Sequence, residues 1–131
     1  MRKRILMIDD DRALTIAWRV RFEASGYDVR IALDGASGLR VAEDFAPDVI
    51  ILDILMPGMN GFEVCRALKS HPVLSRIPVL FMSANVQDEA SRQAMELGAA
   101  GFLPKPFTSG RVLEAIESAI AARADFQIAT P

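Results

Sequence analysis

Five short apolar runs, each separated from the next by an amphipathic stretch, constrain the fold of this chain more than any other feature. The runs cover residues 5–8, 27–33, 49–52, 79–82 and 101–103, and the second of them has a polar edge at Asp28 and Arg30. Continuous apolar runs of this length favour strands that are covered on both faces, as in a parallel sheet. In the stretches between them, apolar residues recur at helical spacing, most clearly in residues 112–120. The chain is therefore expected to alternate strands with helices.

This alternation predicts an α/β fold with right-handed crossovers, a five-stranded parallel sheet and helices on both faces. Five strands fit the flavodoxin-like order 2-1-3-4-5, although spacing alone does not fix the order. The length of 131 residues suits one domain, which we place at residues 1–124. The last helix is expected over residues 109–123. Residues 125–131 lack a clear period and are expected to form a loose C-terminal tail.

The composition excludes several classes of protein. Lys and Arg number 15 against 17 Asp and Glu, so no basic excess exists for direct nucleic-acid binding. The single cysteine, Cys65, and the single histidine, His71, argue against an intrachain disulfide and a zinc site. The apolar runs are too short for a signal-peptide core or a membrane span. We therefore expect a soluble, cytoplasmic protein with no membrane contact.

Polar side chains stand at the ends of four predicted strands. In open α/β sheets, ligands bind outside the carboxyl ends of the strands. Strands 1, 3, 4 and 5 are neighbours in the order given above, so their tips are expected to converge on one cleft. The residues at these tips are Asp9, Asp10 and Asp11 after the first strand, Asp53 at the end of the third, Ser83 after the fourth and Lys105 after the fifth.

Crowded carboxylates need a proton or a cation between them. Two carboxylates about 4 Å apart repel by ~4 kcal/mol at an effective dielectric of 20. An incomplete cage of oxygen ligands suits Mg²⁺, which keeps waters and pairs with phosphate oxygens. With a lysine and a hydroxyl, such a site can transfer a phosphoryl group to a carboxylate and form an acyl phosphate. Asp53 is the best nucleophile candidate, because an aliphatic strand delivers it rigidly to the cleft.

Each of these residues also has a structural interpretation. Acids gather at helix starts, and we assign a mainly N-capping role to Asp11. Taken alone, Lys105 fits a solvated surface lysine, Ser83 a turn hydroxyl and Phe102 a core aromatic residue. The functional interpretation depends on all of them occurring together.

Two loops carry further expectations. Gly58 and Gly61 follow Asp53 and are expected to adopt positive φ angles in turns. His71 precedes Pro72 and is expected to be solvent-exposed, without an acidic neighbour to orient it.

Four segments contain these residues in a fixed order, namely residues 5–11, 48–61, 78–84 and 101–107. Together they resemble the response-regulator receiver domain of two-component signalling, of the chemotaxis type. The resemblance covers residues 3 to about 122. It implies a flavodoxin-like three-layer sandwich with strand order 2-1-3-4-5, and a phosphoprotein that works as a signalling switch.

The resemblance implies a metal site and a phosphoacceptor. Asp53 matches the phosphoacceptor. Asp10 and Asp53 match direct Mg²⁺ ligands, and Asp9 matches the acid that helps to hold the ion. The backbone carbonyl of Leu55 matches the third protein ligand.

The resemblance also implies a phosphate-sensing set. Ser83 matches the hydroxyl that moves toward the phosphoryl group, and Phe102 matches the aromatic switch position. Lys105 matches the lysine that pairs with phosphate, and its bond to Pro106 resembles the cis-proline of the family.

Two positions vary within the family and tune the lifetime of the acyl phosphate. Leu55 places an apolar side chain beside the phosphoryl group, and Asn85 places an amide where other members carry an acid or a base. Neither is an efficient general base for the attacking water. We therefore expect an acyl phosphate that is not lost within seconds.

The expected function is a receiver that takes a phosphoryl group from a histidine kinase or a phosphotransfer protein. It would then signal to a protein effector through helix 87–97, strand 101–103 and helix 109–123. Beyond its own phosphorylation and slow autodephosphorylation, no enzyme activity is expected. A stand-alone receiver, a phosphorelay intermediate, a segment of a larger protein and a homodimer all remain open.

The sequence offers two rival interpretations, a phosphatase and a binding module. A Mg²⁺ phosphatase of the haloacid-dehalogenase type also uses an aspartyl nucleophile, but it places a second Asp where this chain has Leu55. A binding module that has lost its chemistry is disfavoured by the complete set of Asp53, Ser83 and Lys105.

Overall fold

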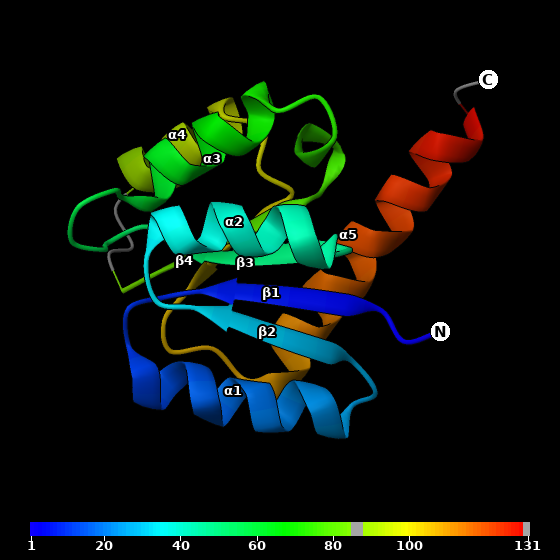
Figure 1. Ribbon diagram of the computed structural model, residues 1–131, viewed down its shortest axis with the longest axis horizontal. Coiled ribbons are helices and arrows are strands. Elements are labelled where there is room, and N and C mark those ends of the chain that lie inside the picture. Colours follow the sequence, from blue (N-terminus) through cyan, green and yellow to red (C-terminus); the bar gives the residue numbers. More distant parts are fainter. Residues whose placement is uncertain (85–87, 130–131) are drawn as a thin grey trace.

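The computed structural model describes residues 1–84 and 88–129, which form strands alternating with helices (Figure 1). The strands are β1 (Arg4–Ile8), β2 (Asp28–Ala32), β3 (Val49–Asp53), β4 (Val79–Ser83) and β5 (Gly101–Pro104). The helices are α1 (Arg12–Ala24), α2 (Gly35–Phe45), α3 (Gly61–Ser70), the 3-10 helix η1 (Leu74–Arg76), α4 (Asp88–Glu96) and α5 (Ser109–Ala129). The alternation expected from the apolar runs is confirmed.

The strands form one parallel, five-stranded sheet in the order β2-β1-β3-β4-β5. This is the flavodoxin-like order, so the expected fold class is confirmed. The register places Ile8 beside Leu52, Asp53 beside Met82 and Ser83 beside Pro104. Because neighbouring strands run in the same direction, the residues that follow β1, β3, β4 and β5 meet at one edge of the sheet.

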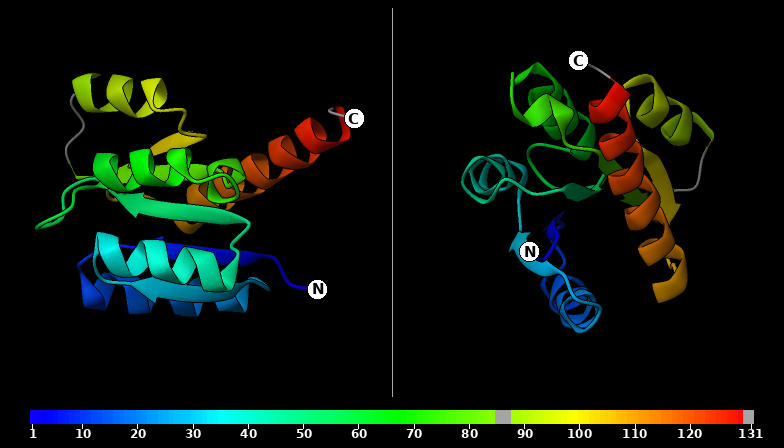
Figure 2. Two further views of the ribbon diagram at one scale, coloured as in Figure 1. Left: turned by 45° about the horizontal axis from the view of Figure 1, so that its top comes forward. Right: turned by 90° about the vertical axis from the view of Figure 1, so that its right-hand side faces the viewer.

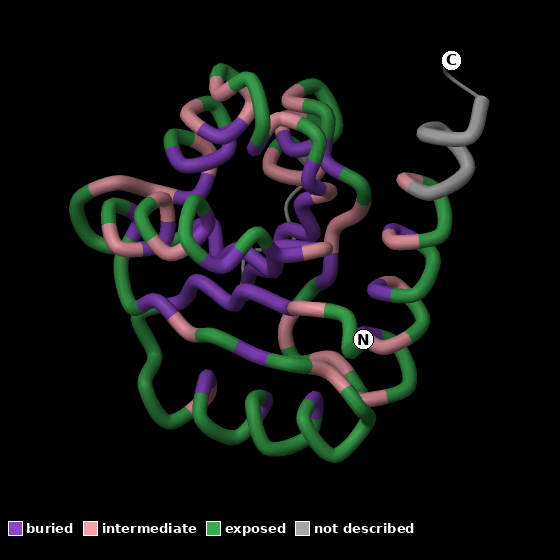
Figure 3. The backbone as a smooth tube through the Cα atoms, turned by 45° about the vertical axis from the view of Figure 1, so that its right-hand side comes forward, coloured by how far each residue is buried: buried purple, intermediate pink, exposed green. Residues whose placement is uncertain are grey.

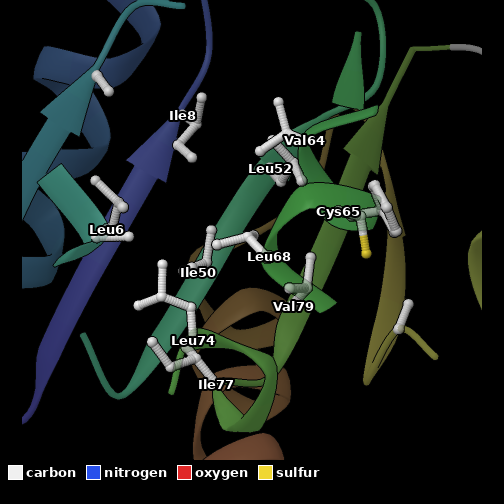
Figure 4. Packing of buried hydrophobic residues seen from close by; sticks show 14 of the residues in the cluster. Leu6, Ile8, Ile50, Leu52, Val64, Cys65, Leu68, Leu74, Ile77 and Val79 are labelled. Carbon is white, nitrogen blue, oxygen red and sulfur yellow. The ribbon is translucent and has the colours of Figure 1, made fainter. Parts of the chain in front are cut away.

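Two apolar clusters hold the sheet between its helices. Helices α1 and α5 cover one face, whereas α2, α3 and α4 cover the other (Figures 1 and 2). Trp18 and Ile116 lie in the first cluster, and Cys65 of α3 lies beside Leu52 and Val64 in the second (Figure 4). The central strands are buried nearly throughout (Figure 3). Burial of a large apolar side chain contributes about 1.5–3 kcal/mol, so these clusters supply the main stabilisation of the fold.

Local signals explain where several helices begin and end. Gly26 and Gly98 follow α1 and α4 with φ angles of +96° and +84°, which glycine adopts without steric cost. Ala46 ends α2 in the left-handed region with φ 51°, and its backbone N–H bonds back into the helix. Asn60 and Glu63 form a capping box at the start of α3.

The last helix is longer than the sequence predicted. We expected its end at residue 123, but α5 continues to Ala129 and projects beyond the body of the domain (Figure 1). Apolar spacing reports which residues face a core, not where a helix stops. The alanine-rich residues 121–124 favour helix, and no Gly or Pro interrupts residues 111–129. The domain boundary at residue 124 stays a prediction.

Other boundaries differ by a residue or so. The second strand is Asp28–Ala32 rather than 27–33, and α4 covers Asp88–Glu96 of the predicted 87–97. Within the described part of the chain, the helices are all too short or too polar to cross a bilayer.

Candidate functional site

The carboxyl edge of the sheet gathers buried polar residues. In the described part of the chain, four polar or charged residues are buried, and three of them stand at this edge. Asp9 follows β1 and is 1% exposed, Asp53 ends β3 and is 4% exposed, and Ser83 ends β4 and is fully buried. Burial of polar groups costs free energy unless they are paired, so such a concentration indicates a site.

Both carboxylate oxygens of Asp9 accept a hydrogen bond. Oδ1 accepts from the backbone N–H of Asp11 at 2.9 Å, and Oδ2 accepts from the Lys105 ammonium at 2.9 Å. The backbone N–H of Asp9 donates to the carbonyl of Ala32, the last residue of β2. These bonds fix Asp9 against the end of the sheet and against the start of α1.

Lys105 connects three strands. Its backbone N–H donates to the Ser83 carbonyl at 2.8 Å, and its Nζ lies 2.9 Å from Asp9 Oδ2 and 3.6 Å from Asp53 Oδ1. Burial alone lowers the pKa of Lys105, but the hydrogen bond to Asp9 and the charge of Asp53 raise its pKa above the ordinary value. The ammonium therefore stays charged between the two carboxylates. The peptide bond to Pro106 is cis, as the resemblance implied.

The Asp53 carboxyl group has a raised pKa. Burial and the neighbouring charge of Asp9 raise the pKa of Asp53 to about 6. The Lys105 ammonium and the backbone N–H of Leu55 act in the opposite direction but do not outweigh them. The Asp53 carboxyl group is thus held in a place that favours a proton or another cation beside it.

Three carboxylates can share one cation here. Asp9, Asp10 and Asp53 each offer one carboxylate oxygen, and these oxygens lie within 4.8 Å of one another. Asp10 is exposed, so the cluster opens toward solvent on its side. An all-oxygen donor set with one open side fits a hard divalent cation that keeps part of its water shell. The predicted grouping of these three acids is confirmed.

Asp11 plays the structural role that we assigned to it. Its carboxylate accepts from the backbone N–H of Leu14 at 3.0 Å and caps α1. The run of three aspartates is thus divided: one caps the helix, and Asp9 and Asp10 face the cluster.

The loop after β3 leads to Gly61, whose importance we did not predict from the sequence. Gly58 has the expected positive φ of +75°, but Gly61 does not, so that expectation is wrong for Gly61. A Cβ at Gly61 would lie 2.3 Å from the backbone carbonyl oxygen of Asp53. Gly61 is required because α3 begins directly against the backbone of the candidate phosphoacceptor. An N-cap residue followed by Gly, shortly after a strand-end Asp, was the available signal.

The remaining predicted residues are placed as follows. Leu55 lies in the loop after β3, and the residue is 58% exposed. Phe102 lies on β5 beside Phe81 and is partly buried against the second cluster. Asn85 lies outside the described residues.

His71 is not part of this site, and our expectation for its surroundings is wrong. Its Nδ1 accepts from the backbone N–H groups of Val73 and Leu74, both at 3.1 Å. Its Nε2 lies 3.7 Å from Glu43 Oε1, so an acidic neighbour is present. Glu43 belongs to α2, and only the packing of α2 beside α3 brings it there.

Comparisons with known proteins agree with this geometry. The family model described as response regulator receiver domain matches residues 5–117. The alkaline phosphatase synthesis transcriptional regulatory protein PhoP of Bacillus subtilis is 37% identical over 131 residues, which is 100% of this chain and 52% of that protein. Response regulator PleD of Caulobacter vibrioides is 42% identical over 106 residues, which is 81% of this chain and 23% of that protein.

A solved structure gives the same result for the fold. Chemotaxis response regulator CheY4 of Vibrio cholerae superposes with a TM-score of 0.86 at 28% identity, covering 91% of this chain and 99% of that one. The chain therefore matches CheY4 over nearly its whole length, but it spans about half of PhoP and less of PleD.

Proposed function

Because the chain belongs to the response regulator receiver domain family, we propose that it is a phosphorylation-controlled switch in which Asp53 accepts a phosphoryl group with Mg²⁺ bound. The observation that carries this proposal is the buried cluster in which Lys105 lies 2.9 Å from Asp9 and 3.6 Å from Asp53. An ion pair that only stabilises the fold requires one acid for one lysine, whereas here two buried acids surround one lysine. Phosphoryl transfer needs both signs of charge at one point.

The transfer step follows from the position of Asp53. An Asp53 carboxylate oxygen bonds to phosphorus while the P–N bond of a donor phosphohistidine breaks. The electron pair of that bond stays on the imidazole nitrogen, which takes up a proton. The product is an acyl phosphate on Asp53. Lys105 Nζ lies 3.6 Å from Asp53 Oδ1, so its charge would stabilise the negative charge that develops there, and Ser83 ends the neighbouring strand.

The donor set supports Mg²⁺ as the cation. Asp10 and Asp53 would be its direct ligands, Asp9 would help to hold it, and the backbone carbonyl of Leu55 would be the third protein ligand. When bound, Mg²⁺ offsets the charge of the three carboxylates and of the phosphoryl oxygens. Without it, the raised pKa of Asp53 works against the carboxylate form that is needed for attack.

The partners follow from the family at a coarse level, because receiver domains partner histidine kinases. A histidine kinase or a phosphotransfer protein in the cytoplasm is the donor for this chain. The output surface consists of helix 87–97, strand 101–103 and helix 109–123, and Ser83 and Phe102 transmit the change to it. Residues 1–124 form the switching unit, either alone, as a relay, as a homodimer or within a larger protein.

The acyl phosphate is expected to persist beyond seconds. Leu55 lies two residues after Asp53, is apolar and is 58% exposed, so it offers no general base to an attacking water. Asn85 offers an amide at the second tuning position.

Labelling with ³²P-acetyl phosphate and Mg²⁺ tests the proposal. The wild-type chain should incorporate one label, which Asp53→Asn abolishes. Asp11→Asn is the matched control, because Asn also caps helices and Asp11 lies outside the cation cluster. Equal labelling of Asp53→Asn and the wild type would place the nucleophile elsewhere. Multiple turnovers of a small phosphate ester would favour a phosphatase instead.

A further inference from the structure

Trp18 lies at the junction between α1 and the segment that carries Lys105. It is the only tryptophan of the chain, and it is 6% exposed in the cluster between α1, α5 and the sheet. Its ring stacks on Phe22 of the same helix, with centroids 5.3 Å apart. On another side it meets Phe107, with centroids 4.9 Å apart and an interplanar angle of 38°. Phe107 follows Lys105 by two residues.

A second contact ties the same segment to α1. The Arg21 guanidinium lies over the Trp18 ring at 5.0 Å from its centroid. Its Nη1 donates to Ser109 Oγ at 3.4 Å, at the first residue of α5. Helix α1 thus holds the chain after β5 at Phe107 and at Ser109. Figure 1 shows this segment passing beside α1 on its way to α5.

These contacts form a closed series that begins and ends at Asp9 in the site. Asp9 accepts from the Asp11 backbone at the start of α1, α1 presents Trp18 to Phe107, and Lys105 returns to Asp9 through its 2.9 Å ion pair. The backbone N–H of Lys105 also donates to the Ser83 carbonyl, at 2.8 Å. Two residues span about 7 Å at most, so a shift of Phe107 moves the Lys105 backbone as well.

We propose that Trp18 is a positioning residue for phosphoryl transfer, because its ring contact with Phe107 holds the segment after β5 so that the Lys105 ammonium stands between Asp9 and Asp53. This inference rests on the proposed role of Asp53 as phosphoacceptor. The apolar packing of Trp18 contributes stability whether or not it positions Lys105. A positioning role is therefore distinguished from a purely stabilising role by the rate of phosphoryl transfer in folded protein, and by the dependence of that rate on Lys105.

The rate test uses four variants at a temperature where all remain folded. Trp18→Leu and Phe107→Leu should each slow labelling of Asp53 from acetyl phosphate by about tenfold, since small misplacements of a catalytic group are costly. Trp18→Phe keeps an aromatic ring and should retain most of the rate. Phe22→Leu is the matched control: it removes the other aromatic partner of Trp18 and should change the rate less than twofold.

The dependence on Lys105 distinguishes a positioning role of Trp18 from a general loss of packing in the domain. In a Lys105→Ala background, Trp18→Leu should slow labelling no further, because its effect passes through the ammonium. An equal slowing in that background would overturn the proposal, and so would an equal slowing by Phe22→Leu.

A second readout does not require phosphorylation. The chain has three lysines, so the ¹³Cε resonance of Lys105 can be assigned by its loss in Lys105→Arg. Trp18→Leu should shift this resonance, whereas Phe22→Leu should leave it in place. An unmoved resonance in Trp18→Leu would overturn the positioning role even if the wild type never accepts phosphate. Absence of labelling in the wild type would instead contradict the function proposed for Asp53.

Discussion

The charged groups at the two ends of the sheet differ in the partners that surround them. At the amino end, Arg4 donates its backbone N–H to Asp48 at 2.7 Å and its guanidinium N–H to the Phe45 carbonyl at 2.8 Å. The guanidinium groups of Arg4 and Arg30 also lie over the Phe45 ring, at 5.6 Å and 4.9 Å from its centroid. These contacts give the charged groups of Asp48, Arg4 and Arg30 polar or aromatic partners, and they connect β1, β2 and α2.

At the carboxyl end, three carboxylates face a single ammonium. Asp9, Asp10 and Asp53 come within 4.8 Å of one another, and Lys105 is the cation that reaches two of them. The amino end therefore stabilises the fold as it stands, whereas the carboxyl end remains short of positive charge until a cation arrives. The same sheet carries a structural end and a binding end, and four measurements test this difference.

The largest effect is expected at the closest backbone approach of the carboxyl end. In Gly61→Ala, the new Cβ would meet the Asp53 carbonyl oxygen at 2.3 Å, so the backbone must shift. We expect a loss of about 3 kcal/mol or more in the free energy of unfolding, measured by urea denaturation.

Gly110→Ala in α5 is the control for this substitution. A Cβ at Gly110 meets nothing within 4 Å, so alanine should stabilise the helix slightly. A Gly61→Ala protein as stable as the wild type would show that α3 has room to move away from Asp53.

Mg²⁺ should stabilise the carboxyl end and leave the amino end unchanged. At about 100 times its dissociation constant, a ligand that binds only the folded state adds about 2.7 kcal/mol. The melting temperature should therefore rise with Mg²⁺ at pH 7, and the rise should shrink in Asp10→Asn. It should also shrink at pH 5, because protons compete for Asp53, whose pKa is about 6. An equal rise in Asp10→Asn would argue against the cluster as the cation site.

Neutralising Asp53 should stabilise the protein in the absence of metal. Its folded-state pKa, about 6, lies above the ordinary carboxyl value. As pH rises, the unfolded chain ionises first, so stability falls between about pH 4 and pH 6 and stays reduced above that window. Asp53→Asn removes this penalty and should gain about 1–3 kcal/mol at pH 7 in EDTA. The gain should disappear near pH 4, and a loss of stability at pH 7 would contradict the assignment.

The smallest change in stability is expected at the amino end, and it is a loss, whereas Asp53→Asn gives a gain. Asp48→Asn keeps the shape of the side chain but removes the charge that accepts from the Arg4 backbone. We expect a loss of about 1 kcal/mol, because a charge-assisted hydrogen bond becomes a neutral one. Thermal melting at pH 7 measures it, and Mg²⁺ affinity should be unchanged. Stabilisation by Asp48→Asn would erase the contrast between the two ends.

Much of this molecule could be predicted from local sequence. The aliphatic runs predicted β1, β3 and β4, because short runs of this kind are typical of strands that are covered on both faces. The strand ends then predicted that Asp9, Asp53, Ser83 and Lys105 meet at one edge of the sheet. The strand order itself came from the family resemblance, since spacing is compatible with several orders.

Tertiary structure decided what depends on distance across the chain. Lys105 and Asp9 are 96 residues apart in sequence, and only the sheet brings them to 2.9 Å. The raised pKa of Asp53 and the ring contact between Trp18 and Phe107 arise in the same way. A residue type and its neighbours in sequence determine strand or helix. Burial, charge coupling and close packing are set by partners that the chain meets only when it folds.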